Sequence, residues 1–327
     1  MVPRKGAGLA RAAPVGHNPG MSPASLDEFV GTCWNDHGSD AAGVFDRFDA
    51  GVALVTEAKH VPPFAGIVVH VAGEHLGRWK DGLAILYRID RPPLVADSPE
   101  GRALARSRAV LELCAGDRKA AHASALAARS GSSQPFAGDL ARILAVAASA
   151  LAGQGATREA AEAFEEAMAL ASYGPTAADP VARALAVTAN NLASAYEERK
   201  DRTPAEDALM VRAAEAARDW WGLAGTWVEA DRAEYRLASS LRHAGRAAEA
   251  IDHARRCQRI AEANLADPYE VCFAHEQLAL AHSALGDALS ARRERDAMAK
   301  LVAKITDEGS RAFATECLTT LDAALSG

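Results

Sequence analysis

The sequence predicts an all-α fold in which about six helical hairpins stack on one another. A helical phrase that sets a small residue after a leucine recurs at Leu192–Tyr196, Leu237–Leu241 and Leu278–His282. Aromatic residues make up only 6% of the chain, so packing must rely on Ala, Leu and Val. A single hairpin cannot bury its apolar face alone, whereas stacked neighbours share one continuous core.

Glycines at regular intervals predict the turns inside the hairpins. Gly77, Gly116, Gly155, Gly245 and Gly286 are expected to end helices, because glycine tolerates left-handed backbone geometry. Most of these intervals are about 40 residues, which is the length of one helical hairpin unit. The interval between Gly155 and Gly245 is about twice as long and should hold two units. We expect the missing central turn in the polar stretch at residues 197–202.

Capping residues predict where several helices begin. Ser25, Thr203, Thr226 and Asp267 are each followed three residues later by Glu, the spacing of a capping box. Pro180, Pro204 and Pro268 stand where a first helical residue has no partner for its N–H. These signals divide the chain into a flexible arm (1–21), an N-terminal helical pair (22–61), helical repeats (62–305) and a C-terminal capping helix (306–327).

Charge and composition limit the compartment and the partners. The formal net charge of −7 argues against a nucleic-acid partner, which would need a basic face. Residues 1–21 lack the apolar segment of a signal peptide, and the longest apolar stretch, residues 143–153, is too short to span a bilayer. Five scattered cysteines do not predict a disulfide framework. We therefore expect a cytoplasmic protein that binds neither nucleic acid nor membranes.

The pattern of small and large residues is clearest over residues 144–170. Leu144, Ala147, Ala148 and Leu151 precede Gly155, and Ala160, Phe164 and Ala167 follow it. In this pattern the chain resembles the tetratricopeptide-repeat (TPR-like) superfamily, as a divergent member with long repeats. Its units exceed the usual 34 residues, and the proline that often closes a family unit is mostly missing. The resemblance implies a right-handed superhelix, an α-solenoid, that binds proteins or peptides in a bacterial cytoplasm.

The resemblance also implies a ligand groove, because the first helix of each hairpin lines the concave side in this family. The positions that carry over are polar and hydrogen-bonding: Arg106, Arg142, Asn190, Ser194, Glu197, Arg232, Tyr235, Ser239, Arg242 and Glu276. We expect the Asn190 amide to clamp an extended peptide backbone, and Arg232 and Arg242 to bind a carboxylate.

Two groups of residues suggest chemistry beyond protein binding. His253, Cys257, Cys272 and His275 could together hold zinc, because two imidazoles and two thiolates suit a tetrahedral ion. Their positions belong to the packed faces of the hairpins, so we expect no metal and no cofactor. His70 with His75, or His275 with His282, could act as acid and base. No activated nucleophile accompanies either pair, so we interpret these histidines as structural or solvated.

Three alternatives remain open at this stage. The first is a peptide-gated sensor that bends at residues 197–203. The second is an α/α-toroid hydrolase, although the carboxylates at Glu159, Glu162, Glu165 and Glu166 follow the polar face of one helix. The third concerns the oligomer, since a homodimer could form through the last helix near Phe313 and Leu318. We favour the interpretation that the protein is a monomeric or dimeric binding module and not an enzyme.

Overall fold

The computed structural model describes residues 25–91, 94–130, 136–172, 174 and 180–326. Every regular element in these residues is a helix, as the sequence predicts. The chain divides into two compact units between α9 and α10. The predicted flexible arm, residues 1–21, lies outside the described residues.

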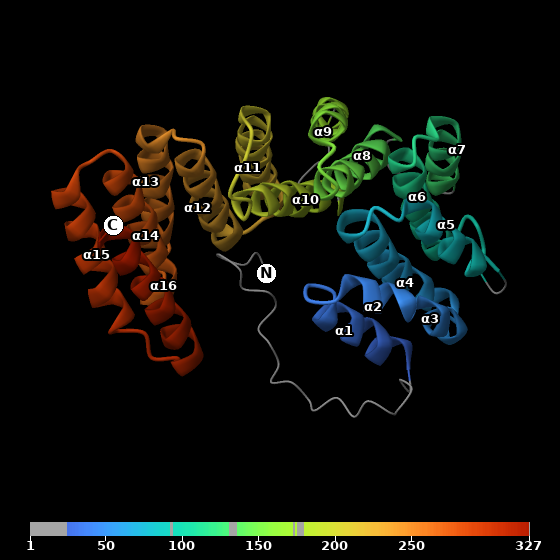
Figure 1. The fold of residues 1–327 in the computed structure, drawn as a ribbon, viewed down its shortest axis with the longest axis horizontal. Coiled ribbons are helices and arrows are strands. Elements are labelled where there is room, and N and C mark those ends of the chain that lie inside the picture. The colour runs from blue at the N-terminus through green and yellow to red at the C-terminus, as the bar shows by residue number, and fades with distance from the viewer. Residues whose placement is uncertain (1–24, 92–93, 131–135, 173, 175–179, 327) are drawn as a thin grey trace. The chain divides into compact units, whose positions relative to one another are not determined.

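The N-terminal unit contains α1 to α9 (Figure 1). Its elements are α1 (Leu26–Asp36), α2 (Ala41–Asp46), α3 (Phe48–Leu54), a 3-10 turn η1 (Ala58–His60), α4 (Val61–Val68), a π-helix η2 (Val69–His75), α5 (Trp79–Arg88), α6 (Pro99–Cys114), α7 (Arg118–Arg129), α8 (Phe136–Gly153) and α9 (Thr157–Ala171). The long helices pack in adjacent pairs, α6 with α7 and α8 with α9.

Residues 22–61 differ from the predicted helical pair, since the described part holds three short α-helices and a 3-10 turn. The Asp40 carboxylate accepts a hydrogen bond from Gly43 N and so starts a new helix directly after α1. Gly51 lets α3 pack closely against Phe29 and Phe64, because a Cβ at position 51 would lie 2.5 Å from the Phe64 ring and 2.6 Å from the Phe29 ring. These phenylalanines, with Phe48, form the aromatic centre of the core.

The C-terminal unit contains α10 to α16. Its helices are α10 (Pro180–Glu197), α11 (Pro204–Ala224), α12 (Trp227–His243), α13 (Ala247–Ala263), α14 (Pro268–Ala284), α15 (Ala288–Val302) and α16 (Glu308–Ser326). They pack as the pairs α10/α11, α12/α13 and α14/α15, with α16 against α14 and α15 (Figure 1). The final helix is as predicted. Phe313 and Leu318, which we considered for a dimer contact, pack partly buried against this unit's core.

The turn and cap predictions are confirmed. Gly77, Gly116, Gly155, Gly245 and Gly286 all have positive φ, at 61°, 82°, 75°, 75° and 77°. Thr203 with Glu206 and Thr226 with Glu229 form complete capping boxes, and Ser25 and Asp267 accept backbone N–H groups at their helix starts. Pro180, Pro204 and Pro268 are first helical residues. Local backbone rules therefore set the boundaries of the paired helices.

Candidate functional site

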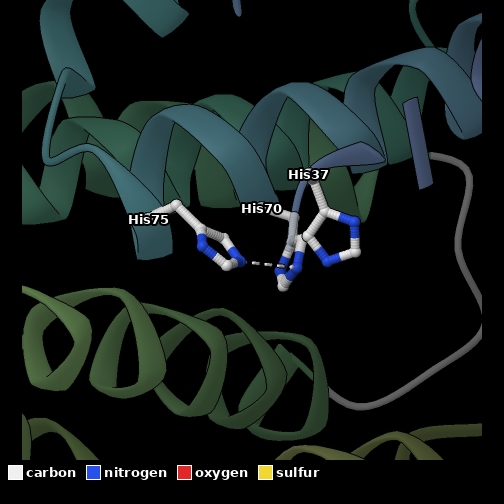
Figure 2. Close-up of side chains that lie close together, drawn as sticks. All are labelled: His37, His70 and His75. Carbon is white, nitrogen blue, oxygen red and sulfur yellow. Dashed lines mark hydrogen bonds between the residues drawn. The ribbon is translucent and has the colours of Figure 1, made fainter. Parts of the chain in front are cut away.

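Three histidines from two elements meet in the N-terminal unit. His37 follows the last residue of α1, and His70 and His75 lie in the π-helix η2. One ring nitrogen of each lies within 4.8 Å of the others, and Nε2 of His70 is 3.2 Å from Nε2 of His75. Figure 2 shows the three rings turned toward one another. We call this group the histidine cluster.

The π-helix is what places His70 beside His75. Residues five apart on an α-helix point about 140° away from each other, since each residue turns the helix by about 100°. In η2 the hydrogen bonds run five residues, as from Leu76 N to Val71 O, so the wider turn brings the two rings together edge to face, with centroids 4.8 Å apart. The opposite face of η2 is buried at Val69, Val71, Ala72 and Gly73.

Helix α8 holds the end of η2 in place. Gln154 donates from Nε2 to the Glu74 carbonyl oxygen at 2.9 Å. Gly153 permits this approach, because a Cβ there would lie 2.2 Å from the same oxygen. The backbone between the two histidines is therefore fixed by tertiary packing.

Hydrogen bonds fix the tautomers of two of the rings. Nδ1 of His37 lies 2.8 Å from the Trp34 carbonyl oxygen, which can only accept, so this nitrogen carries the hydrogen. Nδ1 of His70 lies 3.0 Å from the Glu74 carboxylate, which holds the hydrogen on Nδ1 in the same way. In their neutral forms both rings therefore carry the lone pair on Nε2, and the Nε2 of His70 faces His75.

Aromatic packing and charge also act on the cluster. The Trp34 ring stacks on His70 at a centroid distance of 4.9 Å and meets the edge of His37 at 5.3 Å. Burial lowers the pKa of His37 and of His75, and the nearby His70 lowers both further. Two of the three imidazoles, His37 and His75, thus favour their neutral forms.

Sequence reasoning missed His37. His70 and His75 were noted as a pair and interpreted as structural or solvated, but nothing in the sequence ties them to a residue at the end of α1. The signal in the sequence is the spacing of five residues between His70 and His75. Two residues at this spacing lie on the same side of a helix only where the helix widens into a π-helix. The other pair does not form a unit of this kind, since His275 contacts Glu294 and His282 contacts Asp287.

The structure does not bring together the four residues considered as zinc ligands, for which we expected no metal. Each has a separate protein partner: His253 contacts Glu234 at 2.6 Å, Cys257 donates to Asp231 at 2.9 Å, Cys272 donates to the Tyr269 carbonyl at 3.1 Å, and His275 contacts Glu294 at 2.7 Å. Among the residues described, the ligand atoms that converge are those of the histidine cluster. The spacing places His253 with Cys257 on one face of α13, and Cys272 with His275 on one face of α14. These two faces contact different neighbours, so the four side chains do not converge.

The predicted groove residues of the C-terminal unit lie on α10, α12 and α14. Glu197 accepts hydrogen bonds from Arg236 at 2.6 Å, Ser239 at 3.1 Å and Ser240 at 2.6 Å. Tyr235 donates to Glu276 at 2.8 Å. The structure therefore joins four predicted positions in pairs between neighbouring first helices, Glu197 with Ser239 and Tyr235 with Glu276.

The remaining predicted groove positions have varied surroundings. Arg232 forms a buried ion pair with Glu270, and Ser194 is half-buried on α10. Burial lowers the pKa of Arg242, whose charge faces Tyr235, Glu197 and Glu276. In the N-terminal unit, Arg106 lies 4.0 Å from Asp139, and burial lowers the pKa of both Arg106 and Arg142.

Some buried polar atoms on these first helices have no protein partner. Asn190 is 2% exposed and Gln277 is 1% exposed. The Asn190 side-chain oxygen, both amide atoms of Gln277 and Nε of Arg242 all lack a hydrogen-bond partner. Gln277 was not predicted, although it follows Glu276 directly. We call Asn190, Arg242 and Gln277 the unpaired polar set.

The turn and the carboxylates that two of the alternatives invoke lie in the described residues. Arg202 donates to the carbonyls of Tyr196 and His243 at 3.2 and 3.1 Å and pairs with Asp207, so the turn at residues 197–203 is tied to α10, α11 and α12. The carboxylates at Glu159, Glu162, Glu165 and Glu166 are exposed on α9, as the polar-face interpretation predicts.

The sequence matches no protein-family model, and the search of curated proteins found no significant relative. In the described part of the chain, none of the helices combines the length and apolar character that crossing a membrane requires.

Proposed function

We propose that this chain is a non-catalytic, TPR-like binding module that holds an extended polypeptide against the first helices α10, α12 and α14. The proposal includes the right-handed superhelix of about six repeats and the bacterial cytoplasmic setting that the sequence resemblance implies. The single observation that carries it is the unpaired polar set.

The cost of leaving these atoms unpaired supports a ligand. A buried polar group without a hydrogen bond costs about 1 to 3 kcal/mol, so native proteins rarely keep several close together. Here Asn190, Arg242 and Gln277 stand on three successive first helices of the same unit. A partner that supplied donors and acceptors along this row would recover that cost once the side chains of Asn190 and Gln277, which are 2% and 1% exposed, turn outward to meet it.

The chemistry of the set indicates the partner. An Asn or Gln amide presents one acceptor and one donor, the complement of a peptide group in an extended chain. Arg242 adds a guanidinium whose buried Nε lacks a hydrogen-bond partner, and a carboxylate is the acceptor that binds a guanidinium most strongly. Arg232, which we also expected to bind a carboxylate, is already paired with Glu270. We therefore propose an extended segment with one acidic residue, held near Arg242.

A peptide-display selection tests this proposal. Random peptides are selected on the purified full chain, and the affinity of the enriched sequences is measured by fluorescence anisotropy. We expect enriched peptides to share an acidic residue and to bind the Asn190→Ala and Gln277→Ala variants at least about 10-fold more weakly, the effect of about 1.4 kcal/mol.

The control is Gln258→Ala on α13, where the Gln258 amide donates to Glu262 on the helix surface. This variant should keep wild-type affinity. Selection that enriches nothing over a blank surface, or peptides that bind all three variants equally well, would refute the proposed role.

A further inference from the structure

We propose that His37, His70 and His75 form a binding site for a divalent transition-metal ion, with Zn²⁺ as the best match, that retains an open coordination position. This inference is independent of the proposed peptide binding, because it concerns the other unit of the chain.

The spacing of the nitrogens fits a metal. Zinc binds imidazole nitrogen at about 2.0 to 2.1 Å, so two nitrogens on a tetrahedral ion lie about 3.3 Å apart. The Nε2 atoms of His70 and His75 are already 3.2 Å apart. All three ligand atoms fall within 4.8 Å, so a modest rotation of one ring would complete the set.

The surroundings of the rings match those of metal-binding histidines. Such histidines almost always donate their other ring N–H to a carboxylate or a backbone carbonyl. His70 has the Glu74 carboxylate at Nδ1, and His37 has the Trp34 carbonyl at Nδ1. Both contacts leave the lone pair of the neutral ring on Nε2. Because His70 accepts at Nε2, the close His75 Nε2 carries the hydrogen without metal; to bind the ion through Nε2, neutral His75 takes the tautomer with its hydrogen on Nδ1.

The number and exposure of the ligands indicate the class of ion. Three imidazoles suit Zn²⁺, Ni²⁺ or Cu²⁺, whereas Mg²⁺ and Ca²⁺ require oxygen ligands. His75 is exposed and the other two rings are partly exposed, so a fourth position would face solvent and accept water or a small ligand. Three protein ligands with one open position is the arrangement of reactive rather than purely structural zinc sites.

Binding would also join two elements. His37 ends α1, whereas His70 and His75 belong to η2, so the ion would link the start of the described chain to the centre of its core. We expect metal to raise the melting temperature of the protein and to slow hydrogen exchange in α1.

Zinc titration of the full chain, purified without a polyhistidine tag, tests the inference. Native mass spectrometry gives the stoichiometry, and competition with a chromophoric chelator gives the affinity. We expect one Zn²⁺ per chain, no binding of Mg²⁺ at equal concentration, and the visible bands of four-coordinate Co²⁺ when Co²⁺ is added instead.

Variants identify the site. His75→Asn and His37→Asn should each weaken Zn²⁺ binding by more than about 100-fold, because losing a ligand costs more than losing an outer partner. Glu74→Gln should weaken it about 10-fold while keeping the fold. His122→Asn, at an exposed histidine of α7, is the matched control and should bind as the wild type does.

Three outcomes would overturn the inference: no Zn²⁺ binding by the wild-type chain, equal binding by His75→Asn and the wild type, or equal affinity for Mg²⁺ and Zn²⁺. Circular dichroism of each metal-free variant shows whether it folds. If His37→Asn does not fold, the exposed His75 and the conservative Glu74→Gln still decide the question.

Discussion

The ion pair between Glu197 and Arg236 makes the packing of α10 against α12 testable. The side chains are 6% and 3% exposed, and the carboxylate also accepts from Ser239 and Ser240. Replacing Glu197 by Ala removes three acceptor contacts and leaves the Arg236 charge buried. Breaking a buried pair in this way costs about 3 to 5 kcal/mol. The loss is a large part of the 5 to 15 kcal/mol that typically stabilises a folded domain.

Urea unfolding of the full chain measures this loss. Trp220, Trp221 and Trp227 report on the C-terminal unit by fluorescence, and hydrogen exchange locates the change in α10 and α12. The double variant Glu197→Leu with Arg236→Met removes both charges at once. We expect it to be more stable than Glu197→Ala alone, because apolar residues often replace a buried pair without loss.

Two results would refute this reasoning. A cost below about 1 kcal/mol for Glu197→Ala would mean that water reaches Arg236 and screens its charge. If the double variant is as unstable as Glu197→Ala, the helices depend on the ion pair itself for their register. The cost of Glu197→Ala would then not come from leaving the Arg236 charge without Glu197.

Three further predictions concern single residues. Gly286→Ala should lower the stability of the protein by about 1 to 2 kcal/mol, because Gly286 has a φ of 77°. Gly222→Ala in α11 should raise the stability, because a Cβ there contacts no other atom. Thermal melts of the two variants measure both effects. The Thr226 hydroxyl and N–H hold the pKa of Glu229 at about 2, so its stabilisation is complete above the unfolded pKa, about 4.5, and is lost as pH falls toward 2. Glu229→Gln should be about 1 kcal/mol less stable than the wild type at pH 7, and the two free energies of unfolding, measured in urea, should become equal near pH 2. Burial raises the pKa of Cys114 to about 12, so iodoacetamide at pH 8 should label it only on unfolding, as peptide mass spectrometry would show.

The boundaries of the paired helices were predictable because short-range chemistry sets them. A glycine such as Gly245 ends a helix through its own backbone freedom, and Thr203 caps a helix through a residue three positions away. Such signals are complete in the local sequence. The segment before residue 62 was harder, since its short helices depend on close contacts such as that of Gly51 with Phe29 and Phe64.

The sites were less predictable because their residues come from distant positions. Positions such as Asn190 and Arg242 could be assigned to the first helices from the repeat, but their partners could not. Glu197 with Arg236 and Arg232 with Glu270 are pairs between helices, and which atoms pair depends on the helix crossing. The same holds for the four residues considered as zinc ligands, which share helix faces but meet different neighbours.

The histidine cluster shows why an irregular helix matters for this chain. In a regular α-helix the side chains of His70 and His75 would point in different directions. They could not then both lie beside the His37 ring. The widened turn of η2 costs hydrogen-bond geometry, and such turns occur often at functional sites. Here the Gly153 and Gln154 contacts to Glu74 hold that turn, and Glu74 in turn orients His70. Packing against α8 therefore maintains the backbone that aims the imidazoles, so Gly153→Ala should weaken Zn²⁺ binding without touching a ligand.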